Sequence, residues 1–328
     1  MSHPRLSLAL EGGGLNLSDD RIGVFAARSD TDLSDLPQAQ CQVVTGFKPD
    51  FDRLSGQGFE CLIRPEGRFG SSIIFLPRAK RLAQALIARA VALTDGAVVI
   101  DGQKTDGIDS VLKELRKRAD VQSVISKAHG KLFWFVSDID LSDWNTPETV
   151  EIEGGFVTAP GVFSADGIDP GSDLLAASLP EKLSGDWADL GAGWGYLSRA
   201  LLQRPGVKSL RLVEADHASL DCAQANISDE RASFHWADAT TWQADRRLNG
   251  IVMNPPFHTG RAADPELGRS FIAAAARNLT PQGELWMVAN RHLPYETALA
   301  GFFTDVKEVA GDNRFKVLHA KRPSRQKR

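Results

Sequence analysis

Short apolar runs alternate with amphipathic stretches along the second half of the chain. Apolar runs of about four to eight residues are typical of buried strands, and the stretches between them have helical spacing. This alternation predicts an α/β fold with a doubly wound, mostly parallel sheet and a binding site at the carboxyl ends of its strands. The predicted strands are 210–213, 233–237, 251–253, 283–289, 306–310 and 315–320, and the predicted helices are 216–226, 264–278 and 294–303.

The most informative stretch is an apolar strand that ends in Asp189 and continues through Gly191, Gly193 and Gly195. A helical pattern follows, so the stretch predicts a strand, a tight loop and a helix. Glycine lets the backbone approach a ligand and adopt positive φ angles. The spacing differs from the G-x-G-x-x-G of dinucleotide folds, and a carboxylate before the loop would repel a pyrophosphate. The carboxylate instead suits a cation such as S-adenosylmethionine, and we expect Asp189 to face the amino group of this cofactor.

Two further predicted strands end beside acidic residues. Glu214 lies at roughly the separation, about 20 residues, at which such folds place the acid that binds a ribose diol. Asp238 follows the next strand and is the candidate acceptor for the adenine amino group, with Ala239 beside it in the same site. Each acid alone is most simply a solvated strand end. Three acids at successive strand ends favour one nucleotide-like site.

The sharpest motif is Asn254-Pro255-Pro256-Phe257, directly after an apolar strand. The prolines fix φ and remove two backbone donors, which leaves a rigid elbow with free carbonyl groups. An exocyclic amine on a base is a poor nucleophile, but acceptors for both of its hydrogens favour the form whose lone pair attacks a methyl group. We predict that the Asn254 side-chain oxygen and the Pro255 carbonyl are these acceptors and that Phe257 stacks on the base. Positioning and electrostatics then lower the barrier without a general base.

With these motifs, the chain resembles class I S-adenosylmethionine-dependent methyltransferases with an N-P-P-F motif. It is most similar to the ribosomal RNA guanine-N2 methyltransferases of the small-subunit type. Residues 160–175, PGVFSADGIDPGSDLL, are similar to the signature before the glycine loop of that family, and 313–317, NRFKV, to its closing strand. The likeness is specific over about 156–320. It implies methyl transfer to guanine N2 of ribosomal RNA, in the small subunit or else the large one, with the RNA or a ribosomal subunit as partner.

The first half repeats the plan of strand, acid, loop and helix over residues 97–108. We align Asp101 with Asp189, which places Gln103 and Thr105 where glycines lie in the second half. Their side chains would fill the space of the cofactor. In this alignment Ser126-Lys127 stands about where the ribose acid is expected, and a lysine cannot accept a hydrogen bond. The first half is therefore predicted to be a degenerate copy, which agrees with the resemblance.

The polar, turn-forming stretch 143–148 marks the predicted boundary between the halves. We predict two tandem Rossmann-like methyltransferase domains. Residues 1–145 form a degenerate domain for substrate recognition or folding support, and residues 146–328 form the catalytic domain. The first domain also contains a predicted amphipathic helix at 77–93 with a proline in its first turn.

Charge and composition narrow the partners. The 328 residues, 42% of them hydrophobic, suffice for two cores. A net charge of −4 is atypical of a free-standing nucleic-acid-binding protein, so RNA contacts must be local. The candidate basic surfaces are Arg64, Arg68, Arg78, Lys80 and Arg81; Lys113, Arg116, Lys117 and Arg118; and the tail 321–328, predicted to be a disordered phosphate-binding arm.

The remaining composition predicts what the protein lacks. Three cysteines without a C-x-x-C pair and seven histidines without ligand spacing predict no disulfide and no metal, and the cysteines are expected in the core. No apolar run has membrane length, and the start has no signal-peptide pattern, so we expect a cytoplasmic protein. We also expect a monomer.

Other functions stay open on these residues. An adenine-N6 or protein-glutamine methyltransferase would use the same elbow, because Asn-Pro-Pro recognises an amide or amine and not guanine itself. A non-catalytic RNA-binding protein with a vestigial fold is another alternative, which the intact acids and Asn254 disfavour. A nicotinamide enzyme fits neither the loop spacing nor the Pro-Pro elbow.

Overall fold

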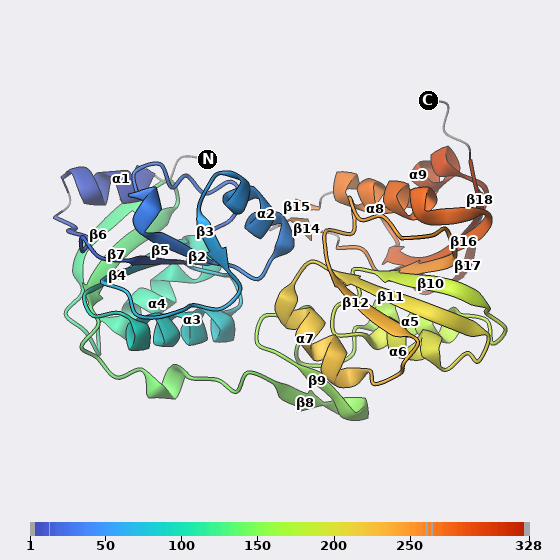
Figure 1. Cartoon of the computed structure of the whole chain (residues 1–328), viewed down its shortest axis with the longest axis horizontal. Coiled ribbons are helices and arrows are strands. Elements are labelled where there is room, and N and C mark those ends of the chain that lie inside the picture. The colour runs from blue at the N-terminus through green and yellow to red at the C-terminus, as the bar shows by residue number, and fades with distance from the viewer. Residues whose placement is uncertain (1–3, 13, 257, 260–261, 264, 325–328) are drawn as a thin grey trace. The chain divides into compact units, whose positions relative to one another are not determined.

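The computed structural model describes residues 4–12, 14–256, 258–259, 262–263 and 265–324. The chain divides into two compact units, Met1–Glu148 and Thr149–Arg328. The boundary predicted from the sequence, between residues 145 and 146, lies three residues before the one in the structure. Each unit contains a seven-stranded sheet, and Figure 1 shows helices on both faces of each sheet.

The sheet of the second unit is doubly wound and mostly parallel, as the sequence predicted. Its strand order is β12-β11-β10-β13-β16-β18-β17, in which β18 runs antiparallel to both of its neighbours. The chain winds outward from β10 to β12 and then returns to start again with β13 on the other side of β10. This reversal creates a switch point between β10 and β13, where open α/β sheets bind their ligands. The strands are β10 (Gly185–Leu190), β11 (Val207–Glu214), β12 (Ala232–Trp236), β13 (Leu248–Met253), β16 (Leu279–Asn290), β17 (Phe303–Gly311) and β18 (Phe315–Pro323).

Helices cover both faces of this sheet, so its central strands bury apolar side chains on both faces. Along β13, Ile251 and Met253 pack into one buried cluster and Val252 packs into another. The helices are α5 (Pro170–Ser178), α6 (Tyr196–Leu202), α7 (His217–Asn226), α8 (Pro265–Asn278) and α9 (Tyr295–Phe302). Two short hairpins complete the unit, β8 (Val150–Ile152) with β9 (Phe156–Thr158) and β14 (His258–Thr259) with β15 (Ala262–Ala263).

The first unit repeats the same strand order, β3-β2-β1-β4-β5-β7-β6. By position in the sheet, β1 is the counterpart of β10, β4 of β13 and β5 of β16. The strands are β1 (Ile22–Phe25), β2 (Cys41–Val44), β3 (Glu60–Leu62), β4 (Ser71–Phe75), β5 (Ala97–Gln103), β6 (Gln122–Lys127) and β7 (Gly130–Val136), and the helices are α1 (Pro4–Glu11), α2 (Lys48–Gly56), α3 (Lys80–Leu93) and α4 (Ile108–Leu115).

The predicted alignment of Asp101 with Asp189 is wrong, because Asp101 lies on β5 and not on the counterpart of β10. The alignment of Gln103, Thr105 and Lys127 with site residues fails with it. Asp101 is a structural residue: it is 1% exposed and accepts a hydrogen bond from Arg5 Nε of α1 at 2.8 Å. A strand followed by an acid, a loop and a helix recurs in βα units, so the local pattern could not identify which strand carried it.

The strand pairing gives a better alignment of the two units. Phe25 and Leu190 end β1 and β10, and each pairs with the neighbouring strands in the same way. Counted along this register, three polar candidates of the second unit have a different residue type in the first. Val24 takes the place of Asp189, Thr45 that of Glu214, and Phe75 that of Asn254.

Several predicted boundaries are wrong, and two of them concern basic segments. Helix α3 begins at Lys80 and not at residue 77, because Leu76 still donates a backbone hydrogen bond to Asp101 in the sheet, at 2.8 Å. The residue before a proline also favours extended backbone. Strand β18 continues to Pro323, so the start of the predicted disordered tail is part of the sheet. Residues 325–328 of the tail lie outside the described residues.

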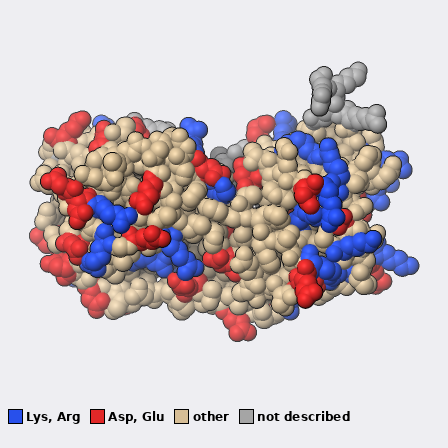
Figure 2. All heavy atoms as spheres, viewed as in Figure 1, with Lys and Arg blue, Asp and Glu red and all other residues tan. Residues whose placement is uncertain are grey.

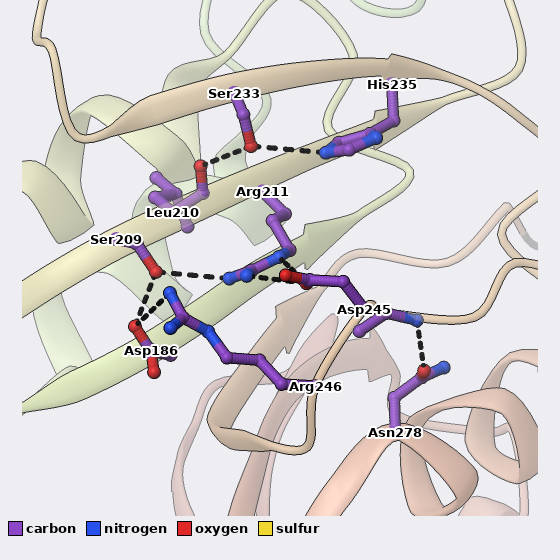
Figure 3. Close-up of polar contacts among 10 residues, drawn as sticks. Asp186, Ser209, Leu210, Arg211, Ser233, His235, Asp245, Arg246 and Asn278 are labelled. Carbon is purple, nitrogen blue, oxygen red and sulfur yellow. Dashed lines mark hydrogen bonds and ion pairs between the residues drawn. The ribbon is translucent and has the colours of Figure 1, made fainter.

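A polar network crosses β10, β11 and β12 of the second unit (Figure 3). Arg211 on β11 is 7% exposed and donates to Asp245 from Nη2 at 2.7 Å. This hydrogen bond lowers the pKa of the Asp245 carboxyl. Ser209 bridges Arg211 and Asp186 at 3.1 and 2.6 Å. Because Asp186 lies near the amino end of β10, the network supports the sheet and not the loop that follows the carboxyl end.

The described ranges contain neither a membrane-spanning helix nor a metal-binding cluster. No helix within them combines the length and apolar character needed to cross a membrane. The same residues contain no group of three histidine, cysteine or carboxylate side chains arranged to hold a metal ion. Cys41 and Cys222 are buried and Cys61 is partly buried, and burial raises the pKa of the first two thiols to about 11.

Candidate active site

The glycine loop joins β10 to α6 in a conformation that favours glycine. Gly191, Gly193 and Gly195 have φ angles of 74°, 54° and 92°, all in the left-handed region. A Cβ atom on Gly195 would lie 2.8 Å from the Ile227 side chain, whereas a Cβ on Gly193 would meet no atom within 4 Å. The loop is thus packed on one side and open at Gly193, where a ligand can approach the backbone.

Glu214, at the end of β11, holds the glycine loop. Its carboxylate accepts hydrogen bonds from the backbone nitrogens of Gly193 and Asp216, both at 2.8 Å. Burial raises the pKa of Glu214 to about 7. A carboxylate has about four lone-pair sites, so both oxygens keep capacity to accept ribose hydroxyl groups.

Asp189 is fully buried at the end of β10, with 0% exposure. Ser198 Oγ donates to its Oδ2 atom at 2.7 Å, while Oδ1 has no partner among the described residues. Burial raises the pKa of this carboxyl to about 7. An unpaired buried oxygen is costly, and a donor from a bound cation would satisfy it. The carboxylate is closed to solvent and is not part of the cavity lining.

Asp238 follows β12 and is partly committed to its own turn. Its Oδ1 atom accepts from the backbone nitrogen and the hydroxyl of Thr240, at 2.8 and 2.7 Å. No described residue donates to Oδ2, which leaves that oxygen for an adenine amino group. Ala239 is 3% exposed and its side chain packs in the core, so only its backbone remains for a ligand.

Asn254 directly follows β13 and therefore lies beside the glycine loop at the switch point. Pro255 is buried, and no described residue donates to its carbonyl oxygen. Phe257, the predicted stacking residue, lies outside the described residues. Asn254 and the glycine loop line one cavity, together with Phe163, Asp169, Ser172, Trp194, Tyr196 and Leu197.

The segment before α5 covers the glycine loop, which the sequence had not indicated. The Trp194 indole donates to the carbonyl of Phe163 at 2.9 Å, and the Phe156 ring lies 5.0 Å from the Trp194 ring. Asn226 of α7 links this segment to the glycine loop, because its side-chain nitrogen donates to the carbonyls of Val157 and Trp194, each at 2.8 Å. Phe163 itself is 59% exposed at the cavity.

Asp169 and Ser172 are site residues that sequence reasoning missed, although both lie within the 160–175 signature. The side-chain nitrogen of Asn254 donates to Asp169 Oδ2 at 3.0 Å and to Ser172 Oγ at 2.9 Å. The pattern Asp-Pro-Gly-Ser signals a helix start, with the aspartate as N-cap. It carries no information about a contact with a residue 85 positions away.

Comparison with known proteins identifies the second unit. Residues 153–319 match the model of the Methyltransferase small domain family. Two proteins named ribosomal RNA small subunit methyltransferase C illustrate the similarity of the whole chain. That of Shewanella sp. (strain MR-7) is 31% identical over 265 residues, 77% of each chain. That of Shewanella amazonensis is 29% identical over 330 residues, 94% of this chain and 93% of the relative.

A solved structure shares the fold of both units. It is the T. thermophilus 16S rRNA N2 methyltransferase RsmC in complex with AdoMet and guanosine, which matches with a TM-score of 0.79. The match covers 97% of this chain and 92% of that one at 24% sequence identity. The likeness extends over the degenerate-looking first unit as well as the second.

Proposed function

Because the chain belongs to the family of ribosomal RNA small subunit methyltransferase C, we propose that it methylates guanine N2 of small-subunit ribosomal RNA with S-adenosylmethionine. The observation that carries this proposal is the cavity at the switch point, which Asn254 and the glycine loop line together. A methyl donor on the loop and an amine at the elbow would therefore lie next to each other.

The residues of the second unit fit S-adenosylmethionine. The glycine loop is open at Gly193, which leaves room for the methionine part of the cofactor. The Glu214 carboxylate oxygens can accept further hydrogen bonds from the ribose diol. Asp238 Oδ2 is available to the adenine amino group, and the unpaired Asp189 Oδ1 suits the cationic amino group. When bound, this cofactor supplies a methyl group activated by a positively charged sulfur.

The elbow would activate the acceptor amine. Asn254 Oδ1 and the Pro255 carbonyl accept the two amine hydrogens, which directs the nitrogen lone pair toward the methyl carbon. Methyl transfer would form the nitrogen–carbon bond as the carbon–sulfur bond of the donor breaks, with S-adenosylhomocysteine as the leaving group and one amine proton lost to solvent. Positioned acceptors of this kind act mainly through orientation and electrostatics.

The RNA substrate must expose its base. A guanine inside a duplex cannot reach the cavity, so the target is unpaired or flipped out. The names of the relatives support the small subunit, and guanosine in the T. thermophilus structure supports guanine over adenine or glutamine. We also propose that the protein acts as a monomer, because one chain carries both the glycine loop and the elbow. The relatives' ribosomal RNA substrate supports a location in the cytoplasm.

Product analysis with an elbow variant tests the function. Nucleoside mass spectrometry should find N2-methylguanosine in small-subunit RNA treated with the wild type. Asn254→Ala should lower kcat by about a hundredfold or more, because a positioned polar group is removed. Its affinity for S-adenosylmethionine in calorimetry should stay near wild type.

A matched control lies on β13, the strand that Asn254 follows. Asn249 is exposed on β13 and accepts from the Asp186 backbone nitrogen, away from the cavity. Asn249→Ala should keep kcat within about twofold of wild type, as surface substitutions usually do. Near-normal turnover of Asn254→Ala would remove Asn254 from the mechanism, and N6-methyladenosine or methylglutamine as product would replace the proposed substrate.

A further inference from the structure

Both amide hydrogens of Asn254 are engaged by α5 and its cap. Nδ2 donates to Asp169 Oδ2 at 3.0 Å and to Ser172 Oγ at 2.9 Å. An amide nitrogen has two donors, so these contacts saturate it. No described residue donates to Asn254 Oδ1.

The chemistry of Asp169 fixes which way this amide faces. An ionised carboxylate only accepts hydrogen bonds, so the Asn254 atom beside it must be the nitrogen. The reversed amide would place two acceptor oxygens together. The oxygen is consequently the atom that Asn254 offers to a ligand in the cavity that it lines.

Asp169 is itself held firmly. Its Oδ2 atom caps α5 by accepting from the Ser172 backbone nitrogen at 2.8 Å, and Pro170 occupies the first turn. Leu175 of α5 is fully buried, and a Cβ on Gly171 would lie 3.2 Å from the Phe315 ring. A packed, capped helix start is a rigid support for a side chain that must be placed accurately.

We propose that Asp169 and Ser172 are positioning residues that set the acceptor orientation of Asn254, which rests on the methyltransferase function proposed above. Without them, the amide rotates and presents its NH2 group to the substrate amine, and two donors then face each other. The carboxylate has a second effect. Accepting from the amide nitrogen polarises the amide and makes Oδ1 a stronger acceptor, because linked hydrogen bonds reinforce one another.

Conservative variants separate positioning from helix capping. Asparagine caps helices about as well as aspartate, so Asp169→Asn should keep the melting temperature but lose the charge and the enforced orientation. We expect kcat to fall roughly tenfold, as when an outer-shell partner of an active-site group is removed, with KM for RNA and cofactor affinity unchanged. Ser172→Ala keeps the capped backbone nitrogen and should lower kcat about threefold.

A double-mutant cycle gives the sharpest outcome. In an Asn254→Ala background, Asp169→Asn should have no further effect on kcat, because its target is gone. The control Asp140→Asn changes another carboxylate that accepts from a serine backbone nitrogen, at 2.8 Å in the first unit, and should leave kcat unchanged. Wild-type kcat for Asp169→Asn, or an equal reduction in both backgrounds, would overturn the proposal.

A second readout is independent of turnover. The side-chain NH2 signals of Asn254, identified by their disappearance in Asn254→Ala, should be shielded from solvent exchange and should move in Ser172→Ala. Unmoved, rapidly exchanging signals would overturn the positioning role. A wild-type protein that makes no N2-methylguanosine would overturn the proposed function instead, while these signals would still report on the amide.

Discussion

At the scale of single residues, the buried Asp189 and the partly buried Glu214 of the cofactor site link binding to pH. The pKa values of Asp189 and Glu214 are both raised to about 7, chiefly by burial. A raised carboxylate pKa means that the folded state binds more protons than the unfolded one. These groups therefore reduce stability as the pH rises from the ordinary value near 4 through about 7.

Without a ligand the folded protein favours the protonated form of these carboxyl groups, whereas a cationic ligand favours the ionised form. Binding should therefore depend on pH. Because the amino and sulfonium groups favour ionised carboxylates, S-adenosylmethionine affinity should rise between pH 6 and 8 by about tenfold for each carboxylate that must ionise. Calorimetry at pH 6 in two buffers of different ionisation enthalpy should detect proton release on binding. Glu214→Gln should bind less tightly at pH 8 and show a flatter profile. An affinity independent of pH, with no proton release, would contradict the assignment.

At the scale of elements, two glycines before α6 are required for different reasons, one for folding and the other for cofactor binding. Gly195 has a φ of 92°, and a Cβ atom there would lie 2.8 Å from Ile227, so Gly195→Ala should destabilise the protein by about 2 kcal/mol or more. Gly193 has a φ of 54° and open space around it, so Gly193→Ala should cost only about 1 kcal/mol. The added methyl group instead occupies the cofactor side of the loop. Thermal unfolding and calorimetry should show a folded Gly193→Ala protein with at least about tenfold weaker cofactor binding, and unaltered binding would contradict the open face as the cofactor site.

Elements were predictable from the sequence where their pattern was local. Strands with a short apolar run, such as residues 251–253 of β13, and the glycine loop between β10 and α6 follow from periodicity and turn chemistry. The start of α3 was not predictable, because a hydrogen bond between Leu76 and Asp101 in another strand delays it. The same limit applies to the site. The motif around Asn254 was visible, but its contact with Asp169 depends on tertiary packing of distant segments.

At the scale of the whole molecule, two units with one strand order carry different chemistry. The first has Val24, Thr45 and Phe75 at the register positions of Asp189, Glu214 and Asn254, so we propose that it binds no cofactor. It nevertheless keeps a complete sheet with its own buried core. A unit that folds without the cofactor site is free to recognise RNA.

The basic residues of the first unit differ in their pairing. Figure 2 shows cationic and anionic side chains intermixed on the visible face of this unit. Arg68, Lys117 and Arg118 each form an exposed ion pair, with Asp95, Glu114 and Asp143. By contrast, no described acidic side chain forms an ion pair with Arg78, Lys80 or Arg81. These three follow β4 directly, at the strand end that corresponds to the elbow of the second unit.

The position of these three cations favours an anionic partner. Lys80 and Arg81 open α3, which has no acidic residue in its first turn. Positive charge at a helix N-terminus opposes the helix dipole, so helix stability does not account for these residues. A phosphate there would interact favourably with both the dipole and the side chains.

Replacing Arg78, Lys80 and Arg81 with alanine should weaken RNA binding and reduce the slope of log affinity against log salt by about 0.7 for each phosphate that the protein no longer neutralises. S-adenosylmethionine affinity should not change. As a control, Arg68, Lys117 and Arg118, which form ion pairs, are replaced with alanine. This triple variant removes the same number of charges and should leave the slope near wild type. Equal slopes for the two triple variants would refute an RNA role for Arg78, Lys80 and Arg81.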